Sequence, residues 1–343
     1  MKKVALLTAS ERAELFGETG SRRGLAAALV EKDFWVCWTL HQLFSHPALK
    51  GHIVFKGGTS LSKVFNAIQR FSEDIDLIVD YEMLGFVGAK HPSACPSRNK
   101  RAALIEEMID VCSRYIEGAF IDLLRDRFAD ALGRKGWELR TRRAPDGSAV
   151  VEFSYPQAVA ERVGYVNPFV LLEPGTNAEF VPKAEYEIRP FAAEEFPALF
   201  EEPAARIEAI KAERTFWEKA TILHAEYHRP AEKPILGRHS RHYYDLAMLA
   251  ATEIRARALA DAGLRQRVVK HKADFYYSKW ARYDLAVPGT LRLVPPEGRL
   301  ADLRRDYEGM RVMLFGEGPT FDQVLETLRG LEDEINAAQE GGE

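Results

Sequence analysis

The sequence predicts an α+β fold, in which strands and helices mix over residues 1–200 and an α-helical region spans residues 201–343. Two observations support this prediction. Short runs rich in branched and aromatic residues, typical of strands, lie mainly before about residue 200. Beyond that point apolar residues recur every three to four positions, which is typical of helices. A length of 343 residues is sufficient for two such domains.

The first 80 residues contain two predicted helices and two predicted strands. Residues 24–44 form a helix, because their apolar positions recur at i, i+4, i+7 and i+8. Residues 52–58, "HIVFKGG", form a short strand that ends in a glycine turn. A second helix begins at about Ser60, and residues 74–80, "DIDLIVD", form a strand rich in branched side chains.

The next 120 residues alternate between loop, helix and strand. Residues 81–100 contain Gly, Pro, Ser and Asn and are typical of a loop. A helix follows over about 101–133, and residues 137–156 resemble a hairpin that turns at "PDG". The runs 168–175 and 184–191 are predicted to form two further strands.

Helical periodicity dominates the region after about residue 200. The positions that share a helix face are Phe216, Ala220 and Leu223, then Tyr243, Leu246, Ala247 and Ala250, then Phe321, Val324, Leu325 and Leu328. The segment "AVPGTLRLVPPEG" interrupts these helices once. Phe216 and Trp217 are predicted to be core residues, since apolar stripes at helical spacing usually face a core.

The composition is that of a globular protein, with 46% hydrophobic and 29% charged residues. No window approaches the roughly 18 apolar residues needed to span a bilayer, and the apolar run near the N-terminus ends at Leu7. We therefore expect a cytoplasmic protein without a membrane partner. The three cysteines are widely separated and no HExxH motif occurs, so the sequence predicts neither a disulfide framework nor a zinc site.

The stretch "VFKGGTSLSKVFNAIQRFSEDIDLIVD", residues 54–80, carries the chemistry. Its glycines allow close backbone approach, and the helix that follows offers free N–H groups to a phosphate. Asp74 and Asp76 stand two apart on a strand and so share a face. Two adjacent carboxylates repel each other unless a cation lies between them, and Mg²⁺ prefers such oxygen ligands. The pattern therefore predicts a metal-dependent phosphoryl or nucleotidyl transferase.

Three further acids and one lysine are candidates for this site. A third metal ligand is expected from a neighbouring strand, and Glu173 at the end of "PFVLLE" is preferred over Glu152 in "AVVEFSY". Lys219 lies on an apolar stripe, where a lysine either extends to solvent or meets a phosphate. Asp245 has Arg241 four residues before it, so an ion pair on a helix surface explains it on sequence alone.

The paired motifs "FKGGTSLSKVF" and "RFSEDIDLIV" resemble those of the nucleotidyltransferase AbiEii/AbiGii toxin family of type IV toxin–antitoxin modules. The segments "EKDFWVCWTL", "ERTFWEKATILH", "RHYYDLAML", "VVKHKADFY" and "LRRDYEGM" are similar to other parts of that family, so the resemblance covers most of the chain. It implies a polymerase-β-like nucleotidyltransferase core followed by a helical domain that completes the active-site cleft.

The resemblance also implies roles for matching residues. Those implied to hold an NTP are Gly57, Gly58, Thr59, Ser60 and Lys63. Asp74 and Asp76 are implied to bind Mg²⁺ or Mn²⁺. Those implied to act in catalysis beside them are Ser72, Lys219 and Asp245. Ser72 is included because related toxins carry a serine two residues before the first aspartate, and Lys219 and Asp245 because they match residues of the family's helical segments. Lys32 and Asp33 in "EKDFW" match the family as well, although the polar face of an amphipathic helix is the preferred interpretation.

The expected reaction is transfer of NMP from an NTP to an acceptor hydroxyl. The resemblance implies a tRNA 3′ end as the acceptor and a cognate antitoxin as a partner. A net charge of −4 leaves room for local basic segments, and residues 125–143 and 229–242 are candidates for holding RNA. Two alternatives remain open: transfer to a protein hydroxyl, and a non-catalytic module that binds a nucleotide or partner.

Overall fold

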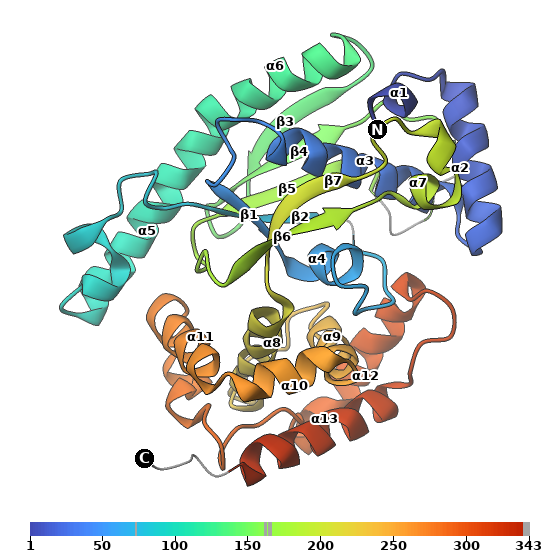
Figure 1. Ribbon diagram of the computed structural model, residues 1–343. Coiled ribbons are helices and arrows are strands. Elements are labelled where there is room, and N and C mark those ends of the chain that lie inside the picture. Colours follow the sequence, from blue (N-terminus) through green and yellow to red (C-terminus); the bar gives the residue numbers. More distant parts are fainter. Residues whose placement is uncertain (73, 161–162, 164–166, 339–343) are drawn as a thin grey trace. The chain divides into compact units, whose positions relative to one another are not determined.

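The computed structural model describes residues 1–72, 74–160, 163 and 167–338 (Figure 1). The chain forms two compact units. The first unit comprises Met1–Val64 and Ser72–Ile210, and the second comprises Phe65–Phe71 and Lys211–Glu343. All the strands belong to the first unit and the long C-terminal helices belong to the second, so the predicted α+β class is confirmed for the described residues.

The first unit combines seven helices with seven strands in the part of the chain described. The helices are α1 (Lys2–Ala5), α2 (Ala9–Arg23), α3 (Ala27–Phe44), α4 (Gly57–Lys63), α5 (Arg98–Tyr115), α6 (Ile121–Leu132) and α7 (Phe191–Glu195). The strands are β1 (Ile53–Lys56), β2 (Asp74–Val79), β3 (Glu138–Arg143), β4 (Ala149–Ser154), β5 (Val170–Gly175), β6 (Lys183–Ile188) and β7 (Ala205–Ile210). The helix predicted over 101–133 is divided by a π-helical turn, Ile116–Phe120.

The strands form one mixed sheet in the order β3-β4-β5-β2-β1-β7-β6. The predicted hairpin is confirmed, since β3 pairs with β4 in antiparallel register. Strand β2 lies at the centre, antiparallel to β1 and parallel to β5. Strand β7 is parallel to β1, and it lies in a stretch that the sequence was expected to fold as helix. Arg206 and Glu208 of β7 point outward and alternate with buried residues over only six positions. A pattern this short does not distinguish a strand from a helix.

The two faces of the sheet differ in what they bury. Ile75 and Leu77 of β2 face the main core, which α3 and α6 help to build. In that core Trp38 packs against Phe128, with ring centroids 4.8 Å apart. The alternate residues of β2 point to the opposite face, where Ile78 belongs to a small apolar cluster with residues of β1 and β7. Since side chains alternate along a strand, Asp74 and Asp76 lie on this second face.

The second unit is helical from Ala212 onward. Its helices are α8 (Ala212–Tyr227), α9 (Ser240–Ala250), α10 (Glu253–Ala260), α11 (Ala262–Phe275), α12 (Glu297–Met310) and α13 (Phe321–Ala337). Helix α8 packs against α9, α10 and α11, and α9 also packs against α12 and α13. Phe216 and Trp217 are buried, as predicted for core residues. Among the described residues, none of the helices combines the length and the apolar character that crossing a membrane requires.

Candidate functional site

The turn between β1 and α4 is built to admit a carboxylate. Gly57 has a φ of +81°, a backbone conformation that other residues rarely adopt. A Cβ atom placed on Gly57 would lie only 1.8 Å from Oδ2 of Asp76. Strand register explains this closeness, because Lys56, the last residue of β1, pairs with Asp76 on β2. Glycine is therefore required here twice, by its conformation and by the space that the aspartate occupies.

The two aspartates predicted as metal ligands lie together on β2. Asp74 and Asp76 are both half-buried, and buried Ile75 between them points into the core on the other face. Their carboxylates thus share the face of the sheet that carries the Gly57 turn. Oxygen donors of this kind are the ligands that Mg²⁺ and Mn²⁺ take, so the donor set fits the implied metal.

Glu173 and Glu152 occupy different positions relative to the aspartates. Glu173 on β5 is in parallel register with Asp76, so its side chain leaves the sheet on the same face. Glu152 is one strand further away on β4, and its carboxylate accepts a hydrogen bond from Arg142 at 2.6 Å. The described residues contain no ready-formed cluster of three metal-ligating side chains. Glu173 is exposed and would have to turn toward Asp76 to act as third ligand.

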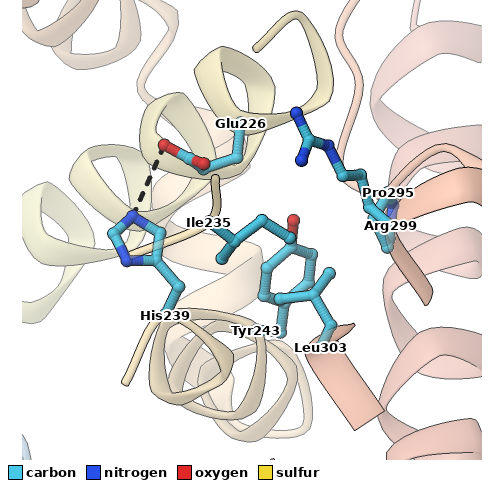
Figure 2. Close-up of a pocket in the computed structure, with 7 residues that line it drawn as sticks. All are labelled: Glu226, Ile235, His239, Tyr243, Pro295, Arg299 and Leu303. Atoms are coloured by element: carbon cyan, nitrogen blue, oxygen red, sulfur yellow. Dashed lines mark ion pairs between the residues drawn. The ribbon is translucent and has the colours of Figure 1, made fainter. Parts of the chain in front are cut away.

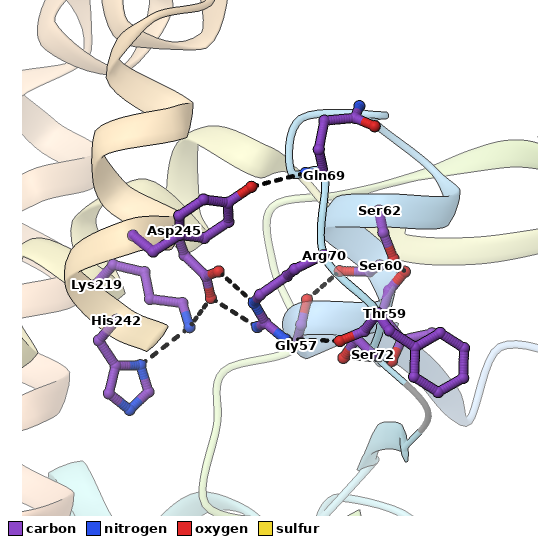
Figure 3. Close-up of polar contacts among 12 residues, drawn as sticks. Gly57, Thr59, Ser60, Ser62, Gln69, Arg70, Ser72, Lys219, His242 and Asp245 are labelled. Carbon is purple, nitrogen blue, oxygen red and sulfur yellow. Dashed lines mark hydrogen bonds and ion pairs between the residues drawn. The ribbon is translucent and has the colours of Figure 1, made fainter. Parts of the chain in front are cut away.

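The hydroxyl groups near the turn have distinct local roles. Ser60 is buried and its hydroxyl donates to the carbonyl oxygen of Gly57 at 2.8 Å, which closes the first turn of α4. Thr59 is also buried, and its Oγ1 donates to Oγ of Ser72 at 2.9 Å (Figure 3). Ser72 is half-buried and immediately precedes the segment that leads into β2. The Thr59–Ser72 hydrogen bond therefore ties the α4 turn to the start of the aspartate strand.

Lys63, at the end of α4, makes a buried ion pair. Its Nζ lies 2.7 Å from Oδ1 of Asp33 on α3 and 4.0 Å from the ring centroid of Phe191. Burial lowers the pKa of Lys63, but the neighbouring Asp33 carboxylate outweighs burial, and the net pKa is raised. The lysine is therefore charged and held by α3. Contact of Lys63 with a nucleotide stays a prediction.

The segment "EKD" on α3 is a buried anchor, so its interpretation as the polar face of an amphipathic helix is wrong. Glu31, Lys32 and Asp33 are at most 5% exposed. Glu31 accepts hydrogen bonds from the backbone after β4, and Lys32 donates to the backbone carbonyls that precede β5. Asp33 accepts from the backbone of Phe191 at the start of α7. Sequence periodicity missed this because an apolar pattern does not register charged residues, and because their backbone partners are more than 100 residues away.

A second group of predicted residues meets in the helical unit. Asp245 on α9 is fully buried, and its Oδ2 lies 2.8 Å from Nζ of Lys219 on α8. Arg70 binds the same carboxylate through two hydrogen bonds of 2.7 and 2.9 Å. Nδ1 of His242 lies 3.1 Å from Nζ of Lys219 (Figure 3). The surface ion pair with Arg241 that sequence alone favoured for Asp245 is therefore wrong.

Burial and neighbouring charges together lower the pKa values of both Lys219 and Asp245. Burial, together with the charges of Arg70 and Arg241, lowers the pKa of Lys219 more than Asp245 raises it. Burial alone would raise the pKa of Asp245, but Arg70 and Lys219 hold it well below its usual range. One carboxylate thus contacts two buried cations, Arg70 and Lys219.

Arg70 was not identified from the sequence. It lies in Phe65–Phe71, which continues from α4 and leads to β2 but packs within the helical unit. The backbone N–H of Gln69 donates to the hydroxyl of Tyr244 at 3.1 Å, and Arg70 forms an antiparallel bridge with Leu314. The sequence offered one signal for Arg70, its position four residues before Asp74. Its partner Asp245 is 175 residues away, so spacing along the chain could not identify the pair.

The family comparison decides the class of protein. Residues 38–327 match the family described as nucleotidyl transferase AbiEii toxin of type IV toxin–antitoxin systems. The chain belongs to this family. It is therefore a nucleotidyltransferase-family enzyme and a toxin-family protein, and membership implies an NTP substrate and a cognate antitoxin. The glycine turn, both aspartates, Lys219 and Asp245 lie inside the matched residues, whereas the "EKD" anchor lies outside them.

A solved structure supports the fold. The chain is similar to MenT4, a nucleotidyltransferase toxin from Mycobacterium tuberculosis, with a TM-score of 0.50 and 16% sequence identity. The match covers 97% of this chain and 91% of MenT4. Among curated proteins none matches the chain. The likeness confirms the nucleotidyltransferase-toxin fold that the motifs predicted.

Ion pairs take up part of the positive charge of the two basic segments of this AbiEii-family chain. In the first, 125–143, four exposed arginines pair with acids: Arg125 with Asp122, Arg140 with Glu138, Arg142 with Glu152 and Arg143 with Glu117. In the second, 229–242, Arg229 donates two hydrogen bonds to Glu226. These pairs reduce the charge that either segment can offer to an RNA phosphate. Their role in holding RNA stays a prediction.

Glu226 also borders a small pocket in the helical unit. The residues that line it are Glu226, Ile235, His239, Tyr243, Pro295, Arg299 and Leu303 (Figure 2). Nε2 of His239 lies 3.4 Å from Glu226. Burial alone would raise the pKa of Glu226, but His239 and Arg229 outweigh burial and lower it to about 2. The pocket has no space for a water-sized guest, so its polar groups are better explained as mutual partners than as a ligand site.

Proposed function

We propose that this enzyme transfers NMP from an NTP to an acceptor hydroxyl in a Mg²⁺-dependent reaction, and that the acceptor is the 3′ end of a tRNA. The observation that carries the proposal is the contact between Gly57 and Asp76. Because residue 57 is a glycine, the carboxylate of Asp76 can lie against the backbone of the turn. This places a candidate phosphate seat and a candidate metal ligand side by side within one unit.

Asp74 and Asp76 would hold the metal, with Mn²⁺ as an alternative to Mg²⁺. Glu173 is the proposed third ligand, since it is in parallel register with Asp76, whereas Glu152 lies one strand further away on β4. When bound, the metal neutralises the charge that develops on the leaving pyrophosphate. Both carboxylates lie on a central strand whose other face is buried, so the protein holds them in place without a loop that must order first.

The turn residues are proposed to bind the triphosphate. Gly57, Gly58 and Thr59 open α4, where backbone N–H groups have no partner within the helix and carry partial positive charge. Ser60 uses its hydroxyl to close the turn, so we assign it a positioning role. Ser72 receives the Thr59 hydrogen bond, and we propose that this contact keeps the turn and the aspartate strand in a fixed relation.

Lys219 is proposed to stabilise the triphosphate, with Asp245 orienting its ammonium group. The support within the helical unit is the position of its Nζ, which lies 2.8 Å from the buried Asp245 carboxylate and 3.1 Å from Nδ1 of His242. A phosphate oxygen is the anion that an amine in this setting binds. That the helical domain completes the active-site cleft remains part of the proposal.

The first experiment incubates the protein with each α-labelled NTP, Mg²⁺ and total tRNA, and resolves RNA and protein on the same gel. The Asp74→Ala/Asp76→Ala protein is the negative control, and Glu173→Gln is compared with Glu152→Gln to assign the third ligand. Label on tRNA from the wild type alone supports the proposal and names the nucleotide. We expect at least a ~10-fold loss of transfer for Glu173→Gln and little change for Glu152→Gln, since changing even a residue that hydrogen-bonds to a metal ligand typically costs about 10- to 100-fold.

Other outcomes point to the alternatives. Label on protein would favour transfer to a protein hydroxyl. Nucleotide binding without release of pyrophosphate would favour a non-catalytic module. Full transfer by the Asp74→Ala/Asp76→Ala protein would refute the metal assignment. Because an NTP and a tRNA are both cytoplasmic, the proposed reaction also places the protein in the cytoplasm, with its cognate antitoxin as regulator.

A further inference from the structure

Helix α11 and the segment after it concentrate positive charge in a chain that is negative overall. Residues 261–284 contain six cationic and three acidic side chains, a net charge of +3, whereas the whole chain carries −4. The cations are Arg265, Arg267, Lys270, Lys272, Lys279 and Arg282. Five aromatic residues, Phe275, Tyr276, Tyr277, Trp280 and Tyr283, alternate with them. Cations interleaved with aromatic rings are the composition of surfaces that bind single-stranded nucleic acid.

The structure exposes the two tyrosines at the end of α11. Tyr276 is 43% exposed and Tyr277 is 50% exposed. The other side of α11 is buried through Leu264 and Val268, and the helix packs against α8, which carries Lys219 (Figure 1). The segment is therefore folded, with one face in the helical core and adjacent aromatic rings left in water. Leaving two such rings exposed forgoes burial that stabilises a protein, so the pair is better explained by a function.

Cations lie over the aromatic rings of this region. Nζ of Lys272 is 4.4 Å from the ring centroid of Tyr276, and the guanidinium carbon of Arg229 is 4.6 Å from that of Trp280. The three acids of residues 261–284 each lie near a cation: Asp261 is 4.0 Å from Arg267, Asp274 is 2.6 Å from Lys270 and Asp284 is 3.0 Å from Arg282. The three cations are exposed, and ion pairs at a surface contribute little, so a phosphate can replace the carboxylate at small cost.

We propose that residues 261–284 form a surface that binds single-stranded RNA, with bases stacked on Tyr276 and Tyr277 and phosphates beside Lys270, Lys272 and Lys279. The exposed rings favour a single strand, because a duplex hides the faces of its bases. They also favour RNA over an acidic protein, which the charges alone would attract equally well. This inference rests on the proposed RNA acceptor and assigns the surface that holds it.

The test measures the affinity for a fluorescein-labelled oligouridylate by fluorescence anisotropy, without NTP or metal. We expect Tyr276→Ala/Tyr277→Ala to weaken binding at least ~10-fold, since a stacked base contributes roughly 1–3 kcal/mol. Tyr276→Phe/Tyr277→Phe keeps the rings and should bind like the wild type. Lys270→Gln/Lys272→Gln should reduce the slope of log K against log salt by about 1.4, the amount expected for two phosphate contacts on a single strand.

The matched control is Arg140→Gln/Arg142→Gln, which removes two exposed arginines that are paired with glutamates. It should leave RNA affinity unchanged, and thermal unfolding of every variant checks that the fold is kept. The inference is overturned if the tyrosine-to-alanine protein binds RNA like the wild type, or if the arginine control loses more RNA affinity than the tyrosine-to-alanine protein. It is also overturned if polyglutamate of equal charge binds as tightly as RNA.

The result is separable from that of the transfer experiment. Tyrosine-dependent RNA binding without any label on RNA would support this surface and reject the proposed acceptor reaction. Label on tRNA, together with RNA binding that the tyrosine substitutions leave unchanged, would support the acceptor reaction and reject this surface.

Discussion

Asp245 offers the sharpest test of how the helical unit is held together. Its carboxylate is fully buried and binds Arg70 through two hydrogen bonds and Lys219 through a third contact of 2.8 Å. Asp245→Asn keeps the shape of the side chain but removes the charge that both Arg70 and Lys219 contact. Breaking a buried pair in this way costs about 3–5 kcal/mol. We expect the free energy of unfolding to fall by that amount, measured by urea denaturation followed by circular dichroism.

A double-mutant cycle separates the pair from general damage. Arg70→Met, Asp245→Asn and the double variant should give a coupling energy of about 2 kcal/mol or more, because the two buried side chains contact each other directly through two charged hydrogen bonds. The exposed pair Arg125–Asp122, 2.9 Å apart, is the control and should couple by roughly 0–1 kcal/mol. If Asp245→Asn unfolds within about 1 kcal/mol of the wild type, the network does not stabilise the helical unit and the reasoning fails.

The same carboxylate predicts a pH dependence. The pKa of Asp245 is lower in the folded protein than in the unfolded chain, where a value of about 3.9 is expected. Its contribution to stability is therefore complete above about pH 4 and is lost as the pH falls through the lower folded value. Stability measured from pH 7 downward should decline less steeply in Asp245→Asn than in the wild type. An unchanged acid limb in the variant would contradict this assignment.

Three further predictions concern other parts of the chain. Gly57→Ala should abolish most NMP transfer, because the added Cβ would overlap the carboxylate of Asp76. Gly136 has a similar φ of +88° and no neighbour within 4 Å, so Gly136→Ala should lower stability but not transfer. Transfer assays and thermal melts distinguish the two variants. Lys63→Met should destabilise the first unit by about 3–5 kcal/mol in urea unfolding, since its buried partner carboxylate is left unpaired, and a smaller loss would show that the pair is solvated. Glu226→Gln should flatten the stability curve between about pH 4.5 and 2, because the folded pKa of about 2 is depressed and that contribution is lost as the pH falls through it; parallel curves would refute the assignment.

Several features of the site were predictable because they depend on neighbours in the sequence. Asp74 and Asp76 must share a face of β2, since side chains alternate along any strand. The strand–glycine–helix turn was also recognisable, and the structure places it at Gly57. The "EKD" segment shows the limit of this reasoning, because a helix buried on all sides has no polar face from which its charged residues could be recognised as buried.

The sequence by itself determined the local elements, the turn, the aspartate pair and the family, because each depends on residues close together in the chain. Only the tertiary structure showed that Arg70 meets Asp245 across 175 positions, that Asp33 holds Lys63, and that Glu173 rather than Glu152 lies beside Asp76. The register of β2 against β5 made the last distinction. Such pairings depend on how strands and helices that are distant in the sequence pack together. A buried charge pairs with a group that lies near it in space, and spacing along the chain does not encode that proximity.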